Sequence, residues 1–145
     1  MTGIDIIQDQ IVEDFSILGQ DAELSNIYLI ELGQKLQLLD EDLKTEENIV
    51  KGCQSKVWLV SNLRDDKIYY QADSNTVITK GLVSLLVKVY SGQHPDDILS
   101  SNLYFIDKIG LHRFIGTQRS NGFAAMIKQM KLEALAHKTK INQAS

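Results

Sequence analysis

The spacing of the hydrophobic residues changes several times along this chain, and each change predicts a different element. Near the N-terminus, apolar residues recur at the spacing of one helix face: Ile4, Ile7, Ile11, Phe15 and Leu18. This pattern predicts an amphipathic helix over roughly the first eighteen residues, with Gly19 as a C-terminal stop. A second helix is predicted from about Ala22 to Leu36, because Leu29, Leu32 and Leu36 share one face.

The middle of the chain loses the helical period. The stretch from Gln37 to Gly52 is polar and acidic, which predicts an extended loop. Loops of this length in a compact domain are usually functional. Beyond it, the strand-forming runs at 57–60 and 67–71 flank a turn-like segment at 61–66, so we expect a β-hairpin.

The segment after the hairpin predicts a helix with one strongly apolar side. The run Asp73-Ser74-Asn75 is expected to cap its N-terminus, and the helix is expected to end near Ser91-Gly92. Its core positions carry aliphatic residues at helical spacing: Ile78, Leu82, Leu85, Leu86 and Val89.

Shorter helical pieces and one long helix are predicted in the C-terminal third. Residues 94–97 start a short helix, with proline in the first turn and acids at the positive end of the helix dipole. Another short piece is expected around 103–109. The last helix is predicted from Arg119 or Ser120 to His137, with an inward face that comprises Phe123, Met126, Ile127, Met130 and Ala134.

Taken in order, these elements predict an α+β fold, in which a small antiparallel sheet packs against several helices. Two strands alone rarely form a stable sheet. We therefore expect a third strand from the loop before Cys53 or from the region near Arg113. The 145 residues fit a single domain that spans 1–145.

Composition narrows the classes of function. The net charge of −4 argues against a nucleic-acid partner, since binding to phosphate backbones depends on clustered Lys and Arg. The longest apolar stretch, 81–90, is interrupted by Lys88 and is too short to cross a bilayer, so no membrane partner is expected. The N-terminus carries no basic leader. We expect a cytoplasmic protein, or an organelle stroma if a targeting peptide is missing.

Cys53 is the only cysteine. It can form no internal disulfide, and alone it can hold neither a four-thiolate zinc site nor an iron–sulfur cluster. A lone thiol can act as a nucleophile or carry an atom on its sulfur. Gly52 allows the backbone to turn sharply, and Gln54 on the other side is polar. The competing interpretation is a small buried hydrophobe in a binding module, because free cysteine is often buried.

A thiol-dependent hydrolase would need a histidine beside Cys53. Of the three histidines, only His112 falls in a segment with no predicted regular structure, and nothing in the sequence places it near the thiol. Arg119 could stabilise a thiolate if the fold brings it close. No nucleotide-binding glycine motif or paired-histidine metal motif occurs, so neither a bound cofactor nor a metal is expected.

Several segments, in order from about residue 15 to residue 131, strongly resemble the SufE family of sulfur-acceptor proteins. The most specific one is the Gly-Cys-Gln-Ser element followed by valine and tryptophan. The matching segments are Tyr28-Leu29-Ile30-Glu31-Leu32-Gly33, Val50-Lys51-Gly52-Cys53-Gln54-Ser55-Lys56-Val57-Trp58, Ala72-Asp73-Ser74, Lys80-Gly81-Leu82 and Arg119-Ser120-Asn121-Gly122.

The resemblance implies a fold similar to the iron–sulfur scaffold proteins, of the IscU/SufE-like type. It implies that Cys53 accepts persulfide sulfur from a pyridoxal-phosphate cysteine desulfurase (SufS or CsdA type), stimulates that enzyme and passes sulfur to an iron–sulfur scaffold. The pyridoxal phosphate (PLP) then belongs to the partner. Asp73 and Arg119 match family positions linked to partner binding or to the surroundings of the active site. Departures at Gln71 and Asn75 leave the exact desulfurase open, since a CsdE-like branch serves a different one.

Overall fold

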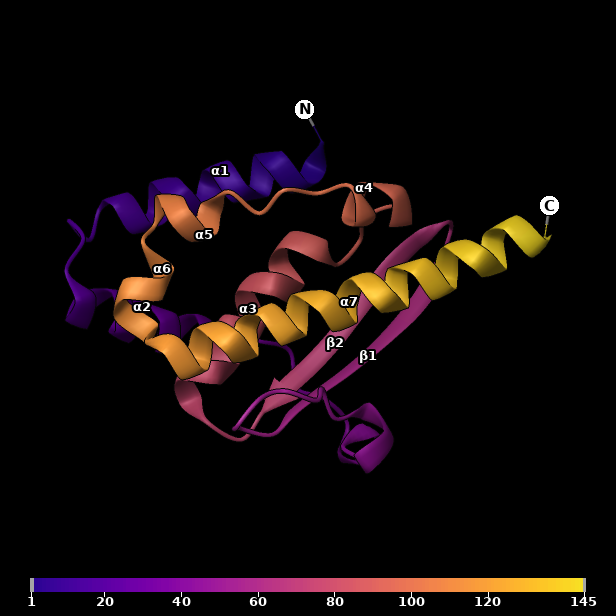
Figure 1. The fold of residues 1–145 in the computed structure, drawn as a ribbon, viewed down its shortest axis with the longest axis horizontal. Coiled ribbons are helices and arrows are strands. Elements are labelled where there is room, and N and C mark those ends of the chain that lie inside the picture. Colours follow the sequence, from indigo (N-terminus) through magenta and orange to yellow (C-terminus); the bar gives the residue numbers. More distant parts are fainter. Residues whose placement is uncertain (1, 145) are drawn as a thin grey trace.

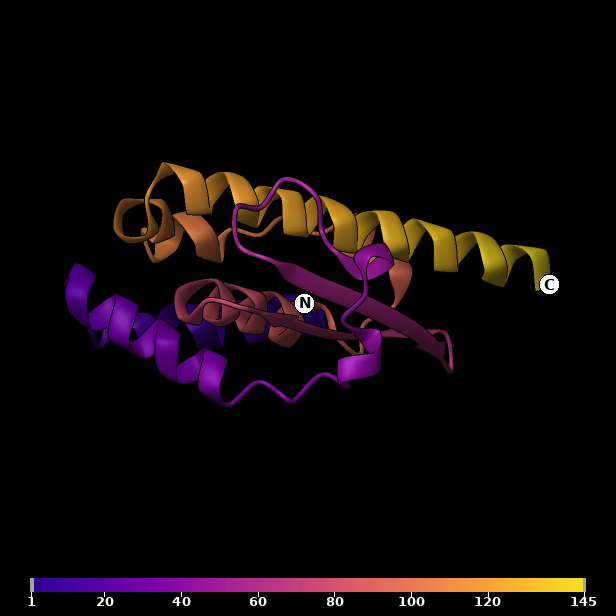
Figure 2. The ribbon, with the colours of Figure 1, turned by 90° about the horizontal axis from the view of Figure 1, so that it is seen from below.

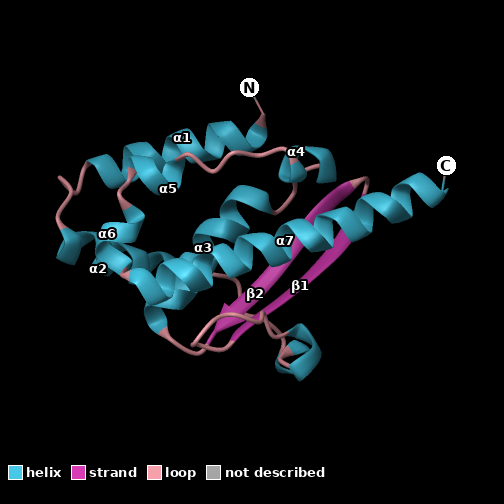
Figure 3. Ribbon diagram, in the orientation of Figure 1, coloured by secondary structure: helices cyan, strands magenta, loops and turns pink. Residues whose placement is uncertain are grey.

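The computed structural model describes residues 2–144 and has an α+β architecture, as the sequence predicts (Figure 1; Figure 3). An antiparallel hairpin of β1 (Val57–Arg64) and β2 (Lys67–Ser74) packs one face against helices. The helices are α1 (Gly3–Ser16), α2 (Ala22–Gln34), α3 (Val77–Tyr90), α4 (Pro95–Leu99), α5 (Phe105–Lys108), α6 (Leu111–Ile115) and α7 (Thr117–Ala144), and the loop before β1 contains the 3-10 turns η1 (Glu41–Leu43) and η2 (Glu46–Asn48).

The hairpin is confirmed, but its strands are longer than predicted. The predicted turn at 61–66 is wrong over 61–64, because Ser61 to Arg64 pair with residues 67–70 of β2. The turn itself consists of Asp65 and Asp66, both with positive φ. The polar residues Asn62 and Arg64 are exposed, and an antiparallel strand with one solvated face accommodates them.

The predicted third strand is wrong. Within residues 2–144 the sheet has two strands, and each outer edge carries one isolated bridge: Ile49 pairs with Trp58, and Gln93 pairs with Ile68. The region near Arg113 is helix α6. A third strand is unnecessary because α3 and α7 cover the inward face of the hairpin, where Val57, Leu59 and Ala72 are buried.

The main helices are confirmed, whereas several of their ends are not. Thr76 is the N-cap of α3 and makes no side-chain capping bond, while Asp73 and Ser74 are the last residues of β2. Gly116, with a φ of +87°, ends α6, and α7 begins one residue later, before the predicted Arg119. At its other end α7 continues past His137.

Helix α3 occupies the middle of the molecule. Figure 2 shows it between α2 on one side and the N-terminal half of α7 on the other, with the hairpin beside it. Its residues Leu82, Leu85, Leu86 and Val89 are almost fully buried. The hairpin is tied to α7 by the buried hydroxyl of Tyr70, which donates a 2.7 Å hydrogen bond to the carbonyl oxygen of Met130.

Helices α2 and α3 cross at two glycines. A Cβ atom added to Gly81 would overlap the carbonyl oxygen of Leu29, and one added to Gly33 would lie 2.8 Å from the backbone nitrogen of Gly81. The two backbones are therefore too close for any side chain at the crossing. This contact fixes the position of α3 and, with it, one wall of the site described below.

We expect Gly81→Ala to lower the free energy of unfolding by about 1–3 kcal/mol, because the added methyl group would force α2 and α3 apart. Urea denaturation measures this change. Lys88→Ala is the matched control, since Lys88 is exposed on the same helix and should leave the midpoint nearly unchanged. Equal midpoints for Gly81→Ala and the wild type would contradict the close approach.

Candidate functional site

Cys53 lies in a short projection that we call the cysteine tip, residues 51–55. The backbone N–H of Val50 donates a 2.8 Å hydrogen bond to the carbonyl oxygen of Val57, which closes the base of the tip. Lys56 is held separately, because its carbonyl oxygen accepts a 2.9 Å bond from the Ser74 hydroxyl. The long predicted loop is therefore ordered by its 3-10 turns and its bridge to β1, and only the tip projects from the hairpin.

Gly52 is required for both conformation and space. Its φ of +96° lies in a region that residues with side chains rarely adopt. A Cβ atom there would lie 3.1 Å from the Cβ atom of Ala125 on α7. The glycine thus lets the tip turn while it packs closely beside α7.

The thiol of Cys53 is half-buried and lies against the first turns of α7. Its Sγ donates a 3.4 Å hydrogen bond to the carbonyl oxygen of Gly122, and Gly122 itself is buried. Burial raises the pKa of the Cys53 thiol, with no neighbouring charge contributing to the shift. The resting thiol is therefore protonated at neutral pH, and the nucleophilic thiolate is a minor form.

A cavity of about 500 Å³ opens beside the thiol. Cys53, Gln54 and Ser55 form one wall, and the first turns of α3 and α7 form the others. The Ser55 and Thr76 hydroxyls lie 2.8 Å apart and join the tip to the start of α3. The structure thus brings Gln54 to the same cavity as Cys53, where its side chain is exposed.

Arg119 lines this cavity as well. It is exposed in the first turn of α7, and its Nη1 donates a 3.1 Å hydrogen bond to the carbonyl oxygen of Ile115. No carboxylate pairs with it among residues 2–144. The guanidinium is therefore available to an anionic group in the cavity.

Unlike Cys53, Gln54 and Arg119, the predicted site residue Asp73 does not line the cavity. Its side chain is buried at the end of β2, with Oδ2 3.0 Å from Lys44 Nζ and Oδ1 3.2 Å from Lys80 Nζ. Burial raises the pKa of this carboxyl. Hydrogen bonds from Lys44, the Ser74 N–H and Lys80 lower it by more, so the net pKa lies below its usual value. The carboxylate is ionised and works as a structural anchor.

None of the three histidines lines the cavity. His112, which belongs to α6, has its Nδ1 2.8 Å from the Ser120 hydroxyl. His137 contacts Ser61, and His94 accepts a bond from the backbone N–H of Asp96. Residues 2–144 therefore provide no histidine base of the kind that a thiol hydrolase needs beside its cysteine.

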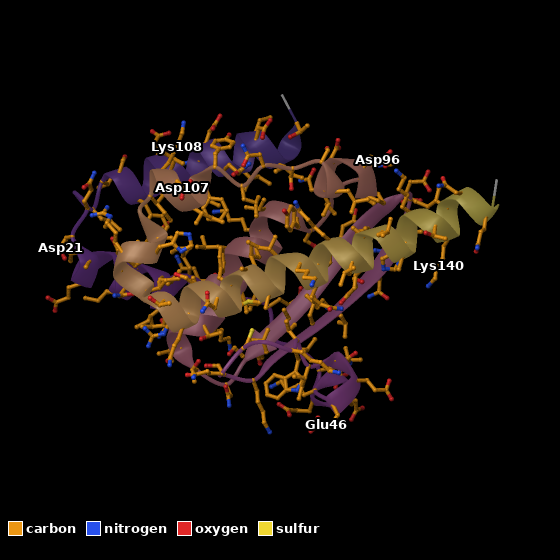
Figure 4. The ribbon with its side chains drawn as sticks, in the orientation of Figure 1. Asp21, Glu46, Asp96, Asp107, Lys108 and Lys140 are labelled. Atoms are coloured by element: carbon orange, nitrogen blue, oxygen red, sulfur yellow. The ribbon has the colours of Figure 1, made fainter. Side chains whose placement is uncertain are left out.

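Residues 2–144 contain no group of His, Cys, Asp and Glu side chains that could hold a metal ion. Glu46 points away from the body of the molecule (Figure 4), whereas Asp96 forms a 2.8 Å ion pair with Lys138 Nζ on α7. No helix in the described part of the chain is long and apolar enough to cross a membrane.

The sequence did not reveal the roles of two residues, one beside Asp73 and one beside the thiol. Lys44 lies inside the polar loop, where one lysine among many charges gives no signal. Gly122 was noticed only as part of a motif, although its carbonyl oxygen holds the thiol. A backbone acceptor leaves no trace in residue identity, so only the fold could reveal it.

The chain is a small α+β domain with one half-buried thiol beside a cavity, and no histidine contacts this thiol. These features define a class of proteins that use a single cysteine without a histidine base. The family model described as Fe-S metabolism associated domain (SufE) matches residues 9–134. The chain belongs to the SufE family. This membership supports a role in sulfur transfer together with a cysteine desulfurase.

Individual relatives agree with this assignment. An uncharacterized SufE-like protein of Rhizobium etli is 40% identical over 131 residues, which cover 87% of this chain and 88% of that protein. The SufE-like protein 1, chloroplastic/mitochondrial, of Arabidopsis thaliana is 40% identical over 104 residues, 71% of this chain and 28% of the plant protein. The solution structure of a hypothetical protein from Thermus thermophilus has a similar fold, with a TM-score of 0.75, 21% identity, and coverage of 92% and 96% of the two chains.

We expect the alkylation rate of Cys53 by iodoacetamide to rise with pH around a midpoint above about 8.5, the ordinary cysteine value. The reason is that burial disfavours the charged thiolate in the folded protein. The same chain unfolded in urea serves as its own control and should show the lower midpoint. A folded midpoint at or below the unfolded one would contradict the desolvated thiol.

Proposed function

We propose that this protein accepts sulfane sulfur on Cys53 from the persulfide of a PLP-dependent cysteine desulfurase of the SufS or CsdA type. It stimulates the desulfurase and passes the sulfur to an iron–sulfur scaffold. The observation that carries the proposal is the placement of the chain's only thiol, at the end of a short projection and beside a cavity shared with Arg119. A carrier needs one thiol that a partner can reach and that has no internal thiol to form a disulfide.

The transfer is an exchange between two sulfur–sulfur bonds. The Cys53 thiolate attacks the terminal sulfur of the donor persulfide, and a new bond forms to Cys53 Sγ. The donor's own sulfur–sulfur bond breaks, and the donor cysteine leaves as a thiolate with the bonding pair. The proton lost by Cys53 balances the proton that the donor thiolate can take up, and no outside oxidant or reductant is needed.

The cavity suits the product of this exchange. A persulfide extends the side chain by one sulfur–sulfur bond, about 2 Å. Such a group is open to attack by small thiols and oxidants unless it is sheltered. The walls next to Cys53 offer that shelter, with apolar side chains such as Leu82 on α3 and Met126 on α7. Keeping the thiol free also requires a reducing compartment, so we propose the cytoplasm or an organelle stroma as the location of the protein.

Incubation with a cysteine desulfurase and free cysteine is expected to add the mass of one sulfur atom to the intact protein. The added mass should disappear on reduction and be absent from Cys53→Ser, because no other thiol can carry it. Intact-mass spectrometry measures both effects, with desulfurase turnover followed in parallel. If Cys53→Ser accepted sulfur and stimulated the enzyme like the wild type, a binding module with an inert cysteine would be the better explanation.

Arg119→Ala is expected to slow sulfur acceptance by up to about tenfold, which corresponds to one pKa unit of stabilisation for an anionic sulfur. Arg119→Lys should retain part of the rate because it keeps the charge. Arg113→Ala is the matched control, since Arg113 is also exposed but does not line the cavity. The rate of mass gain measures the effect, and equal rates for both alanine variants would remove Arg119 from the proposal.

A further inference from the structure

We propose that Lys44 is a positioning residue for Cys53: its ion pair with Asp73 clamps the long loop onto the hairpin, so that only the cysteine tip is free to move. The contacts of Lys44 are observed in the structure and do not depend on the proposed function, whereas their consequence for sulfur transfer rests on it. Lys44 lies between the two 3-10 turns, well before the tip in the chain, and acts on the thiol only through the loop.

Lys44 makes three contacts from the loop. Its Nζ lies 3.0 Å from Asp73 Oδ2 on β2 and 2.8 Å from Glu41 Oε1 within the loop. It also lies 5.6 Å from the centre of the Trp58 ring on β1. The side chain is only 20% exposed, so water screens the pair with Asp73 less than it would screen a surface pair. One lysine thereby joins the loop to both strands of the hairpin.

The register of the sheet explains why this contact orders the loop. Trp58 stands directly opposite Asp73, and Ile49 pairs with Trp58 from the other side. Directly paired residues point to the same face of a sheet, so Ile49, Trp58 and Asp73 form one row. The loop is therefore attached to this row at two points, through the Lys44 side chain at Asp73 and through the pairing of Ile49 with Trp58. The Val50–Val57 hydrogen bond ends the attached segment.

Beyond Val50, side-chain hydrogen bonds hold the tip. The thiol bond to Gly122 is 3.4 Å long, and the Ser55 hydroxyl lies 2.8 Å from the Thr76 hydroxyl and accepts a 3.3 Å bond from the Thr79 hydroxyl. A sulfhydryl is a poor hydrogen-bond donor. Movement is thus confined to residues 51–55 as long as Ile49, Trp58 and Asp73 stay paired. Releasing Lys44 would let the 3-10 turns and the Ile49 pairing loosen, and the base of the tip with them.

Lys80 provides an internal comparison. It binds the other oxygen of the same carboxylate at 3.2 Å, but it belongs to α3 and has no link to the loop. Removing either lysine leaves the buried Asp73 with one ammonium partner. The two variants therefore cause a similar electrostatic loss, and only the loss of Lys44 frees the loop.

The test is the rate at which a neutral maleimide labels Cys53 in the free folded protein, with no desulfurase present. Lys44→Met should label roughly 5- to 30-fold faster than the wild type, because the released loop would expose the thiol more often. Lys80→Met should stay near the wild-type rate, and Lys44→Arg should restore slow labelling. Equal rates for Lys44→Met and the wild type, or equal acceleration in both methionine variants, would overturn the proposal.

Hydrogen exchange of the same variants separates local release from general instability. Peptides covering 41–50 should exchange faster in Lys44→Met alone, while those from α3 should be unchanged in that variant. Uniformly faster exchange across the chain would also overturn the local clamp. Both readouts are independent of sulfur transfer, so they hold even if the mass test on Cys53 fails. If that test succeeds, Lys44→Met loaded with sulfur should lose it faster to added small thiols.

Discussion

The hydrogen bond from the Val50 N–H to the Val57 carbonyl oxygen is the interaction on which the rest of the site depends. It ends the long loop and starts β1 at the same point, so the residues between them must project as a short tip. Without it, Cys53 would lie in a long flexible connection with no defined relation to α7. With it, the thiol is delivered to one carbonyl group, that of Gly122.

The same geometry makes the thiol a weak nucleophile in the free protein. Burial favours its protonated form, and no neighbouring charge offsets this effect on the pKa of the thiol. A permanently activated thiolate would react with any electrophile in the cell. In the proposed function, a protonated, half-buried thiol would become reactive only when the docked desulfurase changes its surroundings. Reactivity and specificity would then have one origin, the desolvation of Cys53.

Much of the fold could be predicted because periodic apolar residues record burial directly. The faces that contain Ile11 on α1 and Leu86 on α3 were correctly placed for this reason. The buried Gln8 interrupts the α1 face and escaped notice, because its partners, Asn102 and Phe105, lie far away in the sequence. The prediction of a third strand was wrong because it rested on the general rule that two strands rarely form a stable sheet. Here two helices, α3 and α7, cover the hairpin instead.

The candidate site was only half predictable, and the reason is physical. Cys53, Gln54 and Arg119 share a cavity because three chain segments meet there, and their residue types alone indicated chemistry. Asp73 looked like a member of the same group. A buried carboxylate must have its charge paired, however, and Asp73 is paired with two lysines and does not line the cavity.

A family position can therefore matter to sulfur chemistry without touching sulfur. Asp73 influences Cys53 through the loop that Lys44 attaches to it, whereas Arg119 faces the cavity itself. Loss of transfer in a variant identifies a contact with sulfur only when the labelling of the resting thiol is unchanged.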